Sequence, residues 1–165
     1  MSFTLRDYRP SDFEALYELD QACYPRGIAY SRAMLRWYLR QHGSFCLVAE
    51  AGAEHEPGQL GLIIAGFIIA QGRGEAGYIV TIDVAKGQRR SGVGTALLEE
   101  AERRLTLAGA RYIELQTATN NEAGIAFWKR HGYRSSGVAR GYYLGRIDAY
   151  EMFKELPQSG RPATA

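Results

Sequence analysis

The sequence contains little of what marks several common protein classes. Two cysteines, Cys23 and Cys46, stand in 165 residues, which excludes a disulfide-rich scaffold. Because the chain does not begin with a secretory signal peptide, we expect reduced thiols and a cytoplasmic protein. The longest apolar run, residues 60–70, is too short to cross a bilayer as a helix, so no membrane partner is expected. The three histidines lack metal-ligand spacing, and we expect no metal.

Charge of either sign is present in only small excess. The 20 Lys and Arg residues against 18 Asp and Glu give a net charge of +2. The arginines are dispersed apart from Arg89 and Arg90, which argues against a nucleic-acid partner bound through bulk charge. With 46% hydrophobic residues, the chain can bury one core but has little room for a second. We therefore predict a single domain over residues 1–156, and residues 157–165 have the composition of a disordered tail.

Hydrophobic periodicity and turn residues predict alternating strands and helices. A capping box at residues 11–14 is expected to open the first helix, which Pro25 and Gly27 end. Ser31 is expected to cap the second helix, and Gly109 to follow the third. The expected strands are 3–6, 44–51, 60–71, 77–84, 112–117, 133–143 and 147–156, the later helices are 91–108 and 121–131, and a polar turn is expected at 54–58.

The turn from Arg89 to Thr95 predicts a binding site for an anion. Gly92 and Gly94 let backbone N–H groups approach a ligand that a Cβ would hold off. The start of the following helix adds unpaired N–H donors and a partial positive charge, which suit a phosphate or pyrophosphate. Arg89 and Arg90 can pair with the same anion. The alternative is an ordinary helix start with closely packed glycines.

Two familiar phosphate-binding loops do not fit this turn. A P-loop needs a lysine after its last glycine, whereas Thr95 follows Gly94. A Rossmann turn needs a small residue where Leu97 stands, and it leaves its strand at once, whereas residues 85–91 intervene here. One Rossmann feature does fit, because Glu114 lies about where the ribose-binding acid of that motif is found.

The turn resembles the acetyl-CoA-binding motif of the GNAT N-acetyltransferase superfamily, Arg/Gln-x-x-Gly-x-Gly/Ala. Residues 82–84 look like that family's splayed strand, and residues 121–133 resemble its Asn-x-x-Ala-x-x-x-Tyr-x-x-x-Gly-Phe segment. The resemblance implies an α/β fold with a mixed, mostly antiparallel sheet of about seven strands and about four helices, splayed at the cofactor cleft. The residues that match the N-terminal amino-group acetyltransferases, which include ribosomal-protein-alanine enzymes, are Ala22 to Pro25, Tyr142, Tyr143, Asp148, Ala149 and Met152.

The resemblance also implies acetyl-CoA as co-substrate. In this family a backbone N–H of the splayed strand, here that of Val84, holds the oxyanion of the tetrahedral intermediate. The cofactor-binding residues that it implies are Ile82, Asp83, Val84, Arg89, Arg90, Ser91, Gly92, Val93, Gly94, Thr95, Asn121 and Trp128.

The implied activity is direct acetyl transfer to a primary amine in a ternary complex. The acceptor that we expect is a protein or peptide N-terminal α-amino group, such as that of a ribosomal protein. The alternatives are a small-molecule amine or a lysine side chain and, in another class, a non-catalytic acetyl-CoA sensor. We expect a monomer or a homodimer.

The catalytic positions depart from the family's pattern. The tyrosine that usually donates to the sulfur corresponds to Trp128, which is either a weak donor or a core residue. The usual base corresponds to Gln116, which can hold a water but cannot take a proton. Glu114, on the same strand face, is the nearest carboxylate or else a solvated strand-end charge. Tyr78 matches a catalytic tyrosine of the eukaryotic relatives or is an ordinary strand aromatic. The candidate catalytic residues are therefore Glu114, Gln116, Tyr78 and, from the alternating pair with Tyr142, Tyr143.

Overall fold

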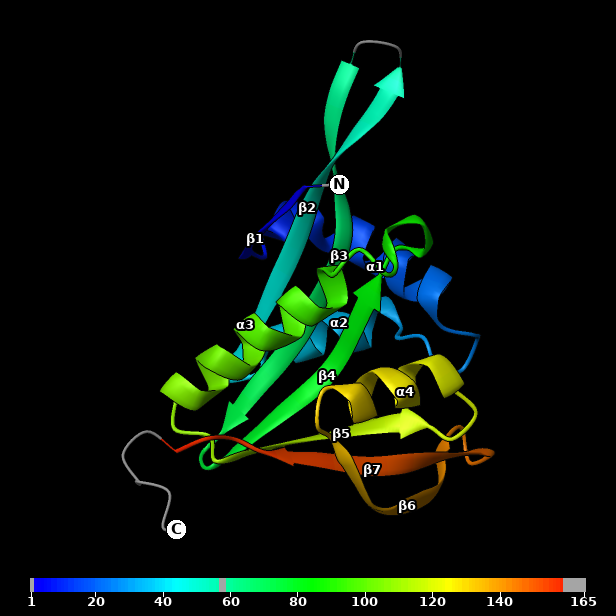
Figure 1. Ribbon diagram of the computed structural model, residues 1–165. Helices are drawn as coiled ribbons and strands as arrows, with labels where there is room; N and C mark the ends of the chain where they lie inside the picture. Colours follow the sequence, from blue (N-terminus) through cyan, green and yellow to red (C-terminus); the bar gives the residue numbers. More distant parts are fainter. Residues whose placement is uncertain (1, 57–58, 159–165) are drawn as a thin grey trace. The chain divides into compact units, whose positions relative to one another are not determined.

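Figure 1 shows the computed structural model, which describes residues 2–56 and 59–158, the side chains of 53–56, 59 and 60 excepted. The predicted turn at 54–58 and the predicted tail at 157–165 lie partly outside these residues. Seven strands follow the order β1-β2-β3-β4-β5-β7-β6 in one sheet. The strands are β1 (Phe3–Asp7), β2 (Ser44–Glu56), β3 (Gln59–Arg73), β4 (Ala76–Val84), β5 (Tyr112–Ala118), β6 (Arg134–Tyr143) and β7 (Ile147–Glu155). The helices are α1 (Phe13–Cys23), α2 (Arg32–Arg40), α3 (Val93–Leu107) and α4 (Glu122–Arg130), with 3-10 turns at Pro10–Asp12 and Lys86–Gln88.

The pairing of the strands confirms the mixed, mostly antiparallel sheet that the resemblance implied. Strands β1 and β2, β2 and β3, β5 and β7, and β6 and β7 pair antiparallel. Strands β4 and β5 pair parallel, from Ala76 opposite Tyr112 to Tyr78 opposite Glu114. This pairing is short although both strands continue, which agrees with the implied splay.

The chain divides into two compact units. Unit 1 comprises residues 1–71 and 80–101, and unit 2 comprises residues 72–79 and 102–165. Strand β4 and helix α3 each continue along the chain from one unit into the other. The single domain predicted for residues 1–156 stays a prediction. No helix of residues 2–56 and 59–158 is long and apolar enough to span a membrane.

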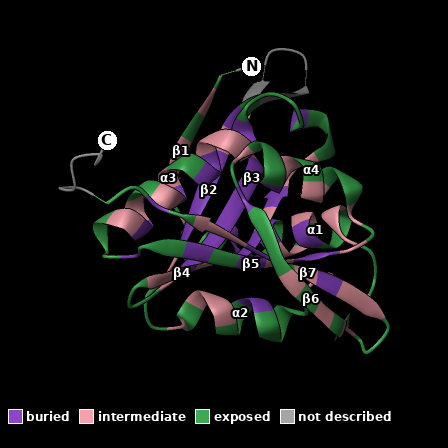
Figure 2. Ribbon diagram, turned by 60° about the horizontal axis from the view of Figure 1, so that its bottom comes forward, coloured by how far each residue is buried: buried purple, intermediate pink, exposed green. Residues whose placement is uncertain are grey.

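Unit 1 is built on strands β2 and β3. Residues 65–70 of β3 are all buried, which is expected of a strand covered on both faces, and Figure 2 shows the same burial along β2. Helices α1 and α2 contribute the fully buried Leu16 and Leu35. Beyond the last pair with β1, Phe3 opposite Ala51, strands β2 and β3 continue as a two-stranded ribbon (Figure 1).

A glycine is required where α3 begins over β3. A Cβ at Gly66 would lie 2.7 Å from the carbonyl oxygen of Asp83 and 3.0 Å from Cγ1 of Val93. Both distances are shorter than a carbon atom tolerates beside backbone or a packed side chain. Gly66 therefore lets the end of β4 and the first turn of α3 lie against β3, and it sets the position of the turn between them.

The two predicted helix starts in unit 1 differ in outcome. Ser31 caps α2 as predicted, because its hydroxyl accepts a hydrogen bond from the backbone three residues on, at 3.2 Å. The capping box predicted at residues 11–14 is wrong. Residues Pro10–Asp12 form a 3-10 turn and α1 begins at Phe13, because Pro10 starts a turn and the carboxylate of Asp12 reaches back to the backbone before it.

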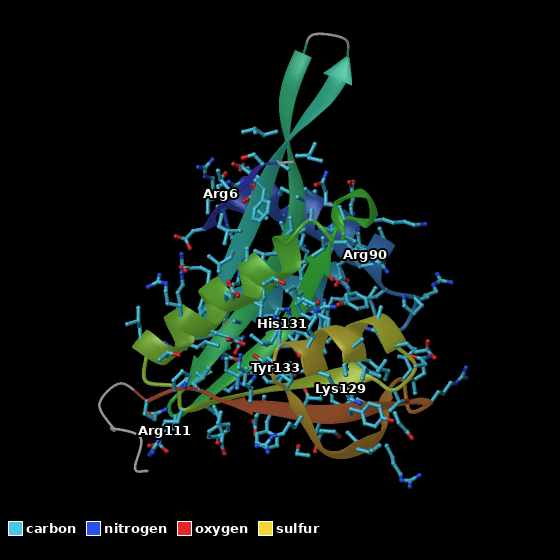
Figure 3. The ribbon with its side chains drawn as sticks, in the orientation of Figure 1. Arg6, Arg90, Arg111, Lys129, His131 and Tyr133 are labelled. Carbon is cyan, nitrogen blue, oxygen red and sulfur yellow. The ribbon has the colours of Figure 1, made fainter. Side chains whose placement is uncertain are left out.

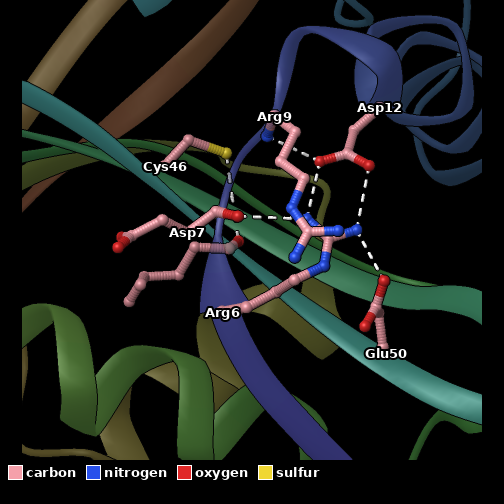
Figure 4. A network of polar contacts seen from close by, with 7 residues as sticks. Arg6, Asp7, Arg9, Asp12, Cys46 and Glu50 are labelled. Atoms are coloured by element: carbon pink, nitrogen blue, oxygen red, sulfur yellow. Dashed lines mark hydrogen bonds and ion pairs between the residues drawn. The ribbon is translucent and has the colours of Figure 1, made fainter.

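An ion-pair network holds β1 against β2 and the start of α1 (Figure 4). The guanidinium of Arg6 donates to both carboxylate oxygens of Asp12, at 2.7 and 2.9 Å, and pairs with Glu50 at 2.6 Å. Asp12 also accepts a hydrogen bond from the backbone N–H of Arg9 at 2.7 Å. The hydrogen bond from Arg6 is the largest cause that lowers the pKa of Asp12 below its usual value. The network thus joins three elements through one arginine.

We expect Asp12→Ala to lower the free energy of unfolding by about 2 kcal/mol at pH 7, because it removes one of the two carboxylates that pair with Arg6. Since the folded-state pKa of Asp12 lies below its unfolded value, its stabilisation is present at neutral pH and is lost as the pH falls below about 4. Urea unfolding of both proteins at pH 7 and pH 3 measures this. Glu18→Ala, an exposed change on α1, is the control. An equal loss at both pH values would contradict the role of the carboxylate.

Unit 2 contains the antiparallel strands β5, β7 and β6, with α4 and the end of α3. A Cβ at Gly77 would lie 2.9 Å from Leu105 of α3, so the start of β4 also lies close to this helix. Glu102 of α3 accepts a hydrogen bond from the hydroxyl of Tyr133 at 3.0 Å and pairs with Lys154 at 2.9 Å. Tyr133 follows α4 and is buried (Figure 3). These contacts join α3, α4 and β7 within the unit.

Candidate active site

The turn predicted to bind an anion has the expected strand-to-helix form. After β4 the chain makes the 3-10 turn Lys86–Gln88, which the sequence did not predict, and α3 begins at Val93. Gly92 has φ +86°, and its carbonyl accepts the first helical hydrogen bond, from Ala96 at 3.0 Å. Val93 is buried and fixes the helix against the core. The first turn of α3 therefore starts from a residue whose conformation favours glycine.

The two arginines of this turn differ in their contacts. Arg89 donates from Nε to the carbonyl oxygen of Val84 at 3.3 Å, and its guanidinium lies 3.9 Å from the sulfur of Cys23. Arg90 has φ +62° and is exposed at the turn, where Figure 3 labels it. The sequence predicted a phosphate role for both. In this structure Arg89 contacts the end of the splayed strand, and Arg90 is exposed to solvent.

Strand β4 carries the candidate oxyanion donor at its end. The carbonyl of Asp83 faces Gly66 of β3, and the N–H of Ala85 donates to Ala65 of β3 at 2.8 Å. Backbone groups alternate along a strand, so the groups of Ile82 and Val84 face the opposite edge. Of the three residues of β4 that the resemblance assigned to the cofactor, Ile82 and Val84 present their backbone at that edge, while the side chain of Asp83 is buried.

Unit 2 brings two of the candidate catalytic residues together. The hydroxyl of Tyr78 on β4 donates a hydrogen bond to Oε1 of Gln116 on β5. The hydroxyl of Tyr142 on β6 reaches the same oxygen at 3.4 Å. The guanidinium of Arg73 lies 4.4 Å from the ring centroid of Tyr78. We call Tyr78, Gln116 and Tyr142 the tyrosine–amide cluster.

The hairpin between β6 and β7 brings Tyr142 to this cluster. Tyr143 was the predicted residue, but it is half-buried and packs edge-on against the ring of Tyr142, with centroids 4.9 Å apart. Gly141, with φ +60°, donates its N–H to Asp148 at 2.8 Å, which bends β6 just before the tyrosines. Sequence reasoning did not assign Asp148 this role, although a carboxylate near a glycine at a hairpin is a typical turn signal.

Glu114 lies on the predicted strand face but outside the tyrosine–amide cluster. The burial of β5 alternates, so Glu114 and Gln116 share one face, as predicted. Glu114 is exposed and stands opposite Phe153 of β7. With Ser136 and Phe153 it lines an open depression of about 540 Å³ in unit 2. Its assignment as a catalytic base stays a prediction.

Asn121 and Trp128 have structural roles in α4. Asn121 accepts a hydrogen bond from the N–H of Gly124 at 3.0 Å, which confirms one of its two predicted roles. Trp128 is 6% exposed and packs edge-on against Phe127 and Tyr133, with centroids 5.1 and 5.2 Å away. This packing is that of a core residue, the alternative that the sequence left open. Contact of either residue with a cofactor stays a prediction.

We expect Trp128→Phe to change the rate of acetyl transfer by less than about tenfold, about 1.4 kcal/mol, because at most a weak hydrogen bond is lost. The same change should lower the free energy of unfolding by about 1–2 kcal/mol, because it leaves space in an aromatic cluster. Steady-state kinetics and urea unfolding measure the two effects. A collapse of the rate at preserved acetyl-CoA affinity would show that the indole is essential.

Within residues 2–56 and 59–158, no three His, Cys, Asp or Glu side chains gather as a metal site would require. The two cysteines are free, Cys46 buried in β2 and Cys23 half-buried at the end of α1. Burial raises the pKa of both thiols. Neither thiol is therefore activated as a nucleophile.

The chain is similar to known acetyltransferases. The family model described as acetyltransferase (GNAT) family matches residues 13–133. An N-alpha-acetyltransferase of Saccharolobus solfataricus is 27% identical over 158 residues, which cover 93% of each chain. The ribosomal-protein-S18-alanine N-acetyltransferase of Escherichia coli superposes with a TM-score of 0.77 at 22% identity, over 99% of this chain and 100% of that one. The structure of Arabidopsis thaliana NAA60 in complex with acetyl-CoA superposes with a TM-score of 0.78 at 20% identity, over 94% of this chain and 99% of that one.

Proposed function

Because the chain belongs to the GNAT family of acetyltransferases, we propose that it transfers the acetyl group of acetyl-CoA to the N-terminal α-amino group of a protein or peptide. The observation that carries the proposal is the turn from β4 to α3. There Gly92, in a left-handed conformation, starts α3 after the 3-10 turn that follows β4, and Ile82 and Val84 of β4 present their backbone at the edge that faces away from β3.

Acetyl-CoA fits this turn through its pyrophosphate and its thioester. The backbone N–H groups of the first turn of α3 and the exposed Arg90 would hold the pyrophosphate. The backbone N–H of Val84 would donate to the oxygen of the thioester as it becomes an oxyanion. The amine nitrogen attacks the thioester carbon, the carbon–sulfur bond breaks, and CoA leaves as the thiolate.

The tyrosine–amide cluster supports an α-amino acceptor. A carboxylate is not part of it, so strong general-base catalysis is not available from its three members. An α-amine with a pKa near 8 is about one-quarter neutral at pH 7.5, whereas a lysine side chain with a pKa near 10.4 is neutral in about one molecule in 800. Transfer of the proton to water through the phenol oxygens suffices for the α-amine. A lysine or small-amine acceptor is the second candidate.

Two of the matched proteins support the same acceptor class. The Saccharolobus relative is named an N-alpha-acetyltransferase, and the Escherichia coli structure is named for the alanine of a ribosomal protein. The free cysteines, Cys23 and Cys46, are consistent with a cytoplasmic location, which we also propose.

A panel of acceptor peptides tests the proposal. Peptides with a free N-terminus, the same peptides with a blocked N-terminus and an internal lysine, and free polyamines are incubated with acetyl-CoA. Released thiol and product mass are measured. Acetylation of the free N-termini alone is expected. Transfer to lysine or polyamine alone would favour the second candidate. Acetyl-CoA binding without transfer to any member would overturn the enzymatic proposal in favour of a sensor.

A further inference from the structure

Two carboxyl groups are buried in unit 1 without full hydrogen bonding. Asp20 of α1 is 0% exposed and Asp83 of β4 is 1% exposed. Oδ1 of Asp20 and Oδ2 of Asp83 have no hydrogen-bond partner among the described residues. Burial raises the pKa of Asp20 to about 6. Burial, and then the charge of Asp20, raise the pKa of Asp83 well above its usual value.

Burying these two carboxyl groups is costly, because each has an oxygen that loses its hydration without gaining a hydrogen bond. The hydrogen bonds of their other oxygens show which part of the chain the carboxyl groups hold in place. Oδ2 of Asp20 accepts a hydrogen bond from the backbone N–H of Tyr30 at 2.7 Å. Oδ1 of Asp83 accepts one from Thr81 at 3.4 Å. Asp20 therefore fixes the far end of the segment between α1 and α2, ten residues along the chain.

That segment is fastened to the edge of β4 that faces away from β3. Cys23 contacts the carbonyl oxygen of Val84 at 3.5 Å, and the hydroxyl of Tyr24 donates to that of Ile82 at 2.9 Å. The hydroxyl of Tyr30 donates to the carbonyl of Val80 at 3.2 Å. The three carbonyls belong to alternate residues, so they lie on one edge of the strand. This edge is the one that faces away from β3, where Ile82 and Val84 present their backbone.

We propose that Asp20 is a positioning residue for the acetyl transfer: it fixes residues 23–30 against the edge of β4 and so shapes the place where the acceptor amine meets the thioester. The proposal rests on the proposed function. Neither carboxyl touches the reacting atoms. Asp20 acts through the backbone of Tyr30. Alongside burial, the charge of Asp20 in turn raises the pKa of Asp83.

The protonation state of Asp20 should therefore affect how well the acceptor peptide binds. A carboxylate accepts the Tyr30 N–H more strongly than a carboxylic acid does. The hydrogen bond from Tyr30 favours ionised Asp20, although burial raises its pKa to about 6 overall. As Asp20 ionises near pH 6, this one hydrogen bond strengthens while the burial penalty lowers the stability of the fold as a whole. Acceptor binding should improve with the stronger hydrogen bond. The other groups that face the pair are Tyr24 and Cys23 next to α1, Thr81 on β4, Cys46 on β2 and Arg89 after β4.

Three variants test this. Asp20→Asn keeps an acceptor for the Tyr30 N–H but does not titrate, Asp20→Leu removes the acceptor, and Glu18→Gln is an exposed control on the same helix. Because the raised pKa makes ionised Asp20 destabilising above about pH 6, Asp20→Asn should melt no lower than the wild type at pH 7.5. This variant therefore remains measurable even if Asp20→Leu unfolds.

We expect Asp20→Leu to raise the KM for the acceptor peptide about tenfold while kcat and the affinity for acetyl-CoA change less than about threefold. For Asp20→Asn, the ratio of wild-type to variant kcat/KM is followed from pH 5 to pH 8. The titration of the amine cancels in this ratio, which should rise with a midpoint near pH 6. Glu18→Gln should give a flat ratio.

A flat ratio for Asp20→Asn, or an unchanged acceptor KM in a folded Asp20→Leu, overturns the positioning role. If Asp20 had only a structural role, its variants would change the melting temperature, but the ratio of wild-type to variant kcat/KM would show no step near pH 6. If the wild type acetylates no acceptor, the proposed function fails. If the wild type is active and the ratio is flat, this proposal alone fails.

Discussion

Gly92→Val is expected to reduce the affinity for acetyl-CoA by at least about 100-fold, about 2.7 kcal/mol. Gly92 has φ +86°, a conformation that a β-branched residue rarely adopts. Lack of space is not the reason, since nothing lies within 4 Å of a Cβ built there. Valine would instead force the turn out of the conformation that directs the first N–H groups of α3 at the pyrophosphate. Isothermal titration calorimetry with acetyl-CoA measures the loss.

Gly109→Val is the matched control. Gly109 follows the other end of α3, has φ +99° and also has open space around its Cβ position. Both variants should lose about 1–2 kcal/mol of stability through the same backbone strain. Only Gly92→Val should lose acetyl-CoA binding. Equal affinities in the two variants would contradict the placement of the pyrophosphate at the start of α3.

Tyr78→Phe is expected to lower kcat about 100-fold while the affinity for acetyl-CoA stays within about threefold. Tyr78 and Tyr142 both direct their hydroxyl protons at Oε1 of Gln116. Their oxygen lone pairs are therefore left to accept a hydrogen bond from the N–H of the amine, or from the O–H of a water that carries the amine proton away. Phenylalanine removes the nearer of these two acceptors. Steady-state kinetics with an N-terminal peptide measures the effect.

Two further variants test the roles of Gln116, which orients the two phenol groups, and of Tyr142. Gln116→Leu should reproduce most of the loss, because it removes the oxygen that orients both phenols. Tyr142→Phe should cost less than about tenfold, because its contact is longer and its side chain is 46% exposed. Unchanged kcat in Tyr78→Phe would remove the tyrosine–amide cluster from the reaction.

The sequence was sufficient where a structural signal is local. Ser31 and Asn121 cap their helices as predicted, because capping depends on a side chain and the backbone three residues on. The box at residues 11–14 failed because Pro10 starts a 3-10 turn that takes in Ser11. The carboxylate of Asp12 holds this turn through the N–H of Arg9 and also pairs with Arg6 of β1, a partner that local spacing does not reveal. Strand β2 extends to Glu56 rather than to Ala51 because β3 pairs with it there.

The site follows the same distinction. The glycine turn after β4 could be predicted, since its conformation depends on residues that are adjacent in the sequence. The hydrogen bond between Tyr78 and Gln116 joins residues 38 positions apart, and only the resemblance brought them together. Asp20 had no signal, because its contact is with a backbone N–H ten residues away. Only the resemblance marked Tyr24, because its partner lies on β4, 58 residues away in the chain.

The two thiols of unit 1 differ in exposure, so their reactivity can be used to measure local unfolding of this unit. Cys23 is half-buried and open to reagents in the folded protein, whereas Cys46 is 6% exposed and lies in β2 between β1 and β3. A small alkylating reagent should therefore modify Cys23 first. Cys46 should react only when β2 is transiently released, so its labelling rate measures the free energy of that opening without an introduced probe.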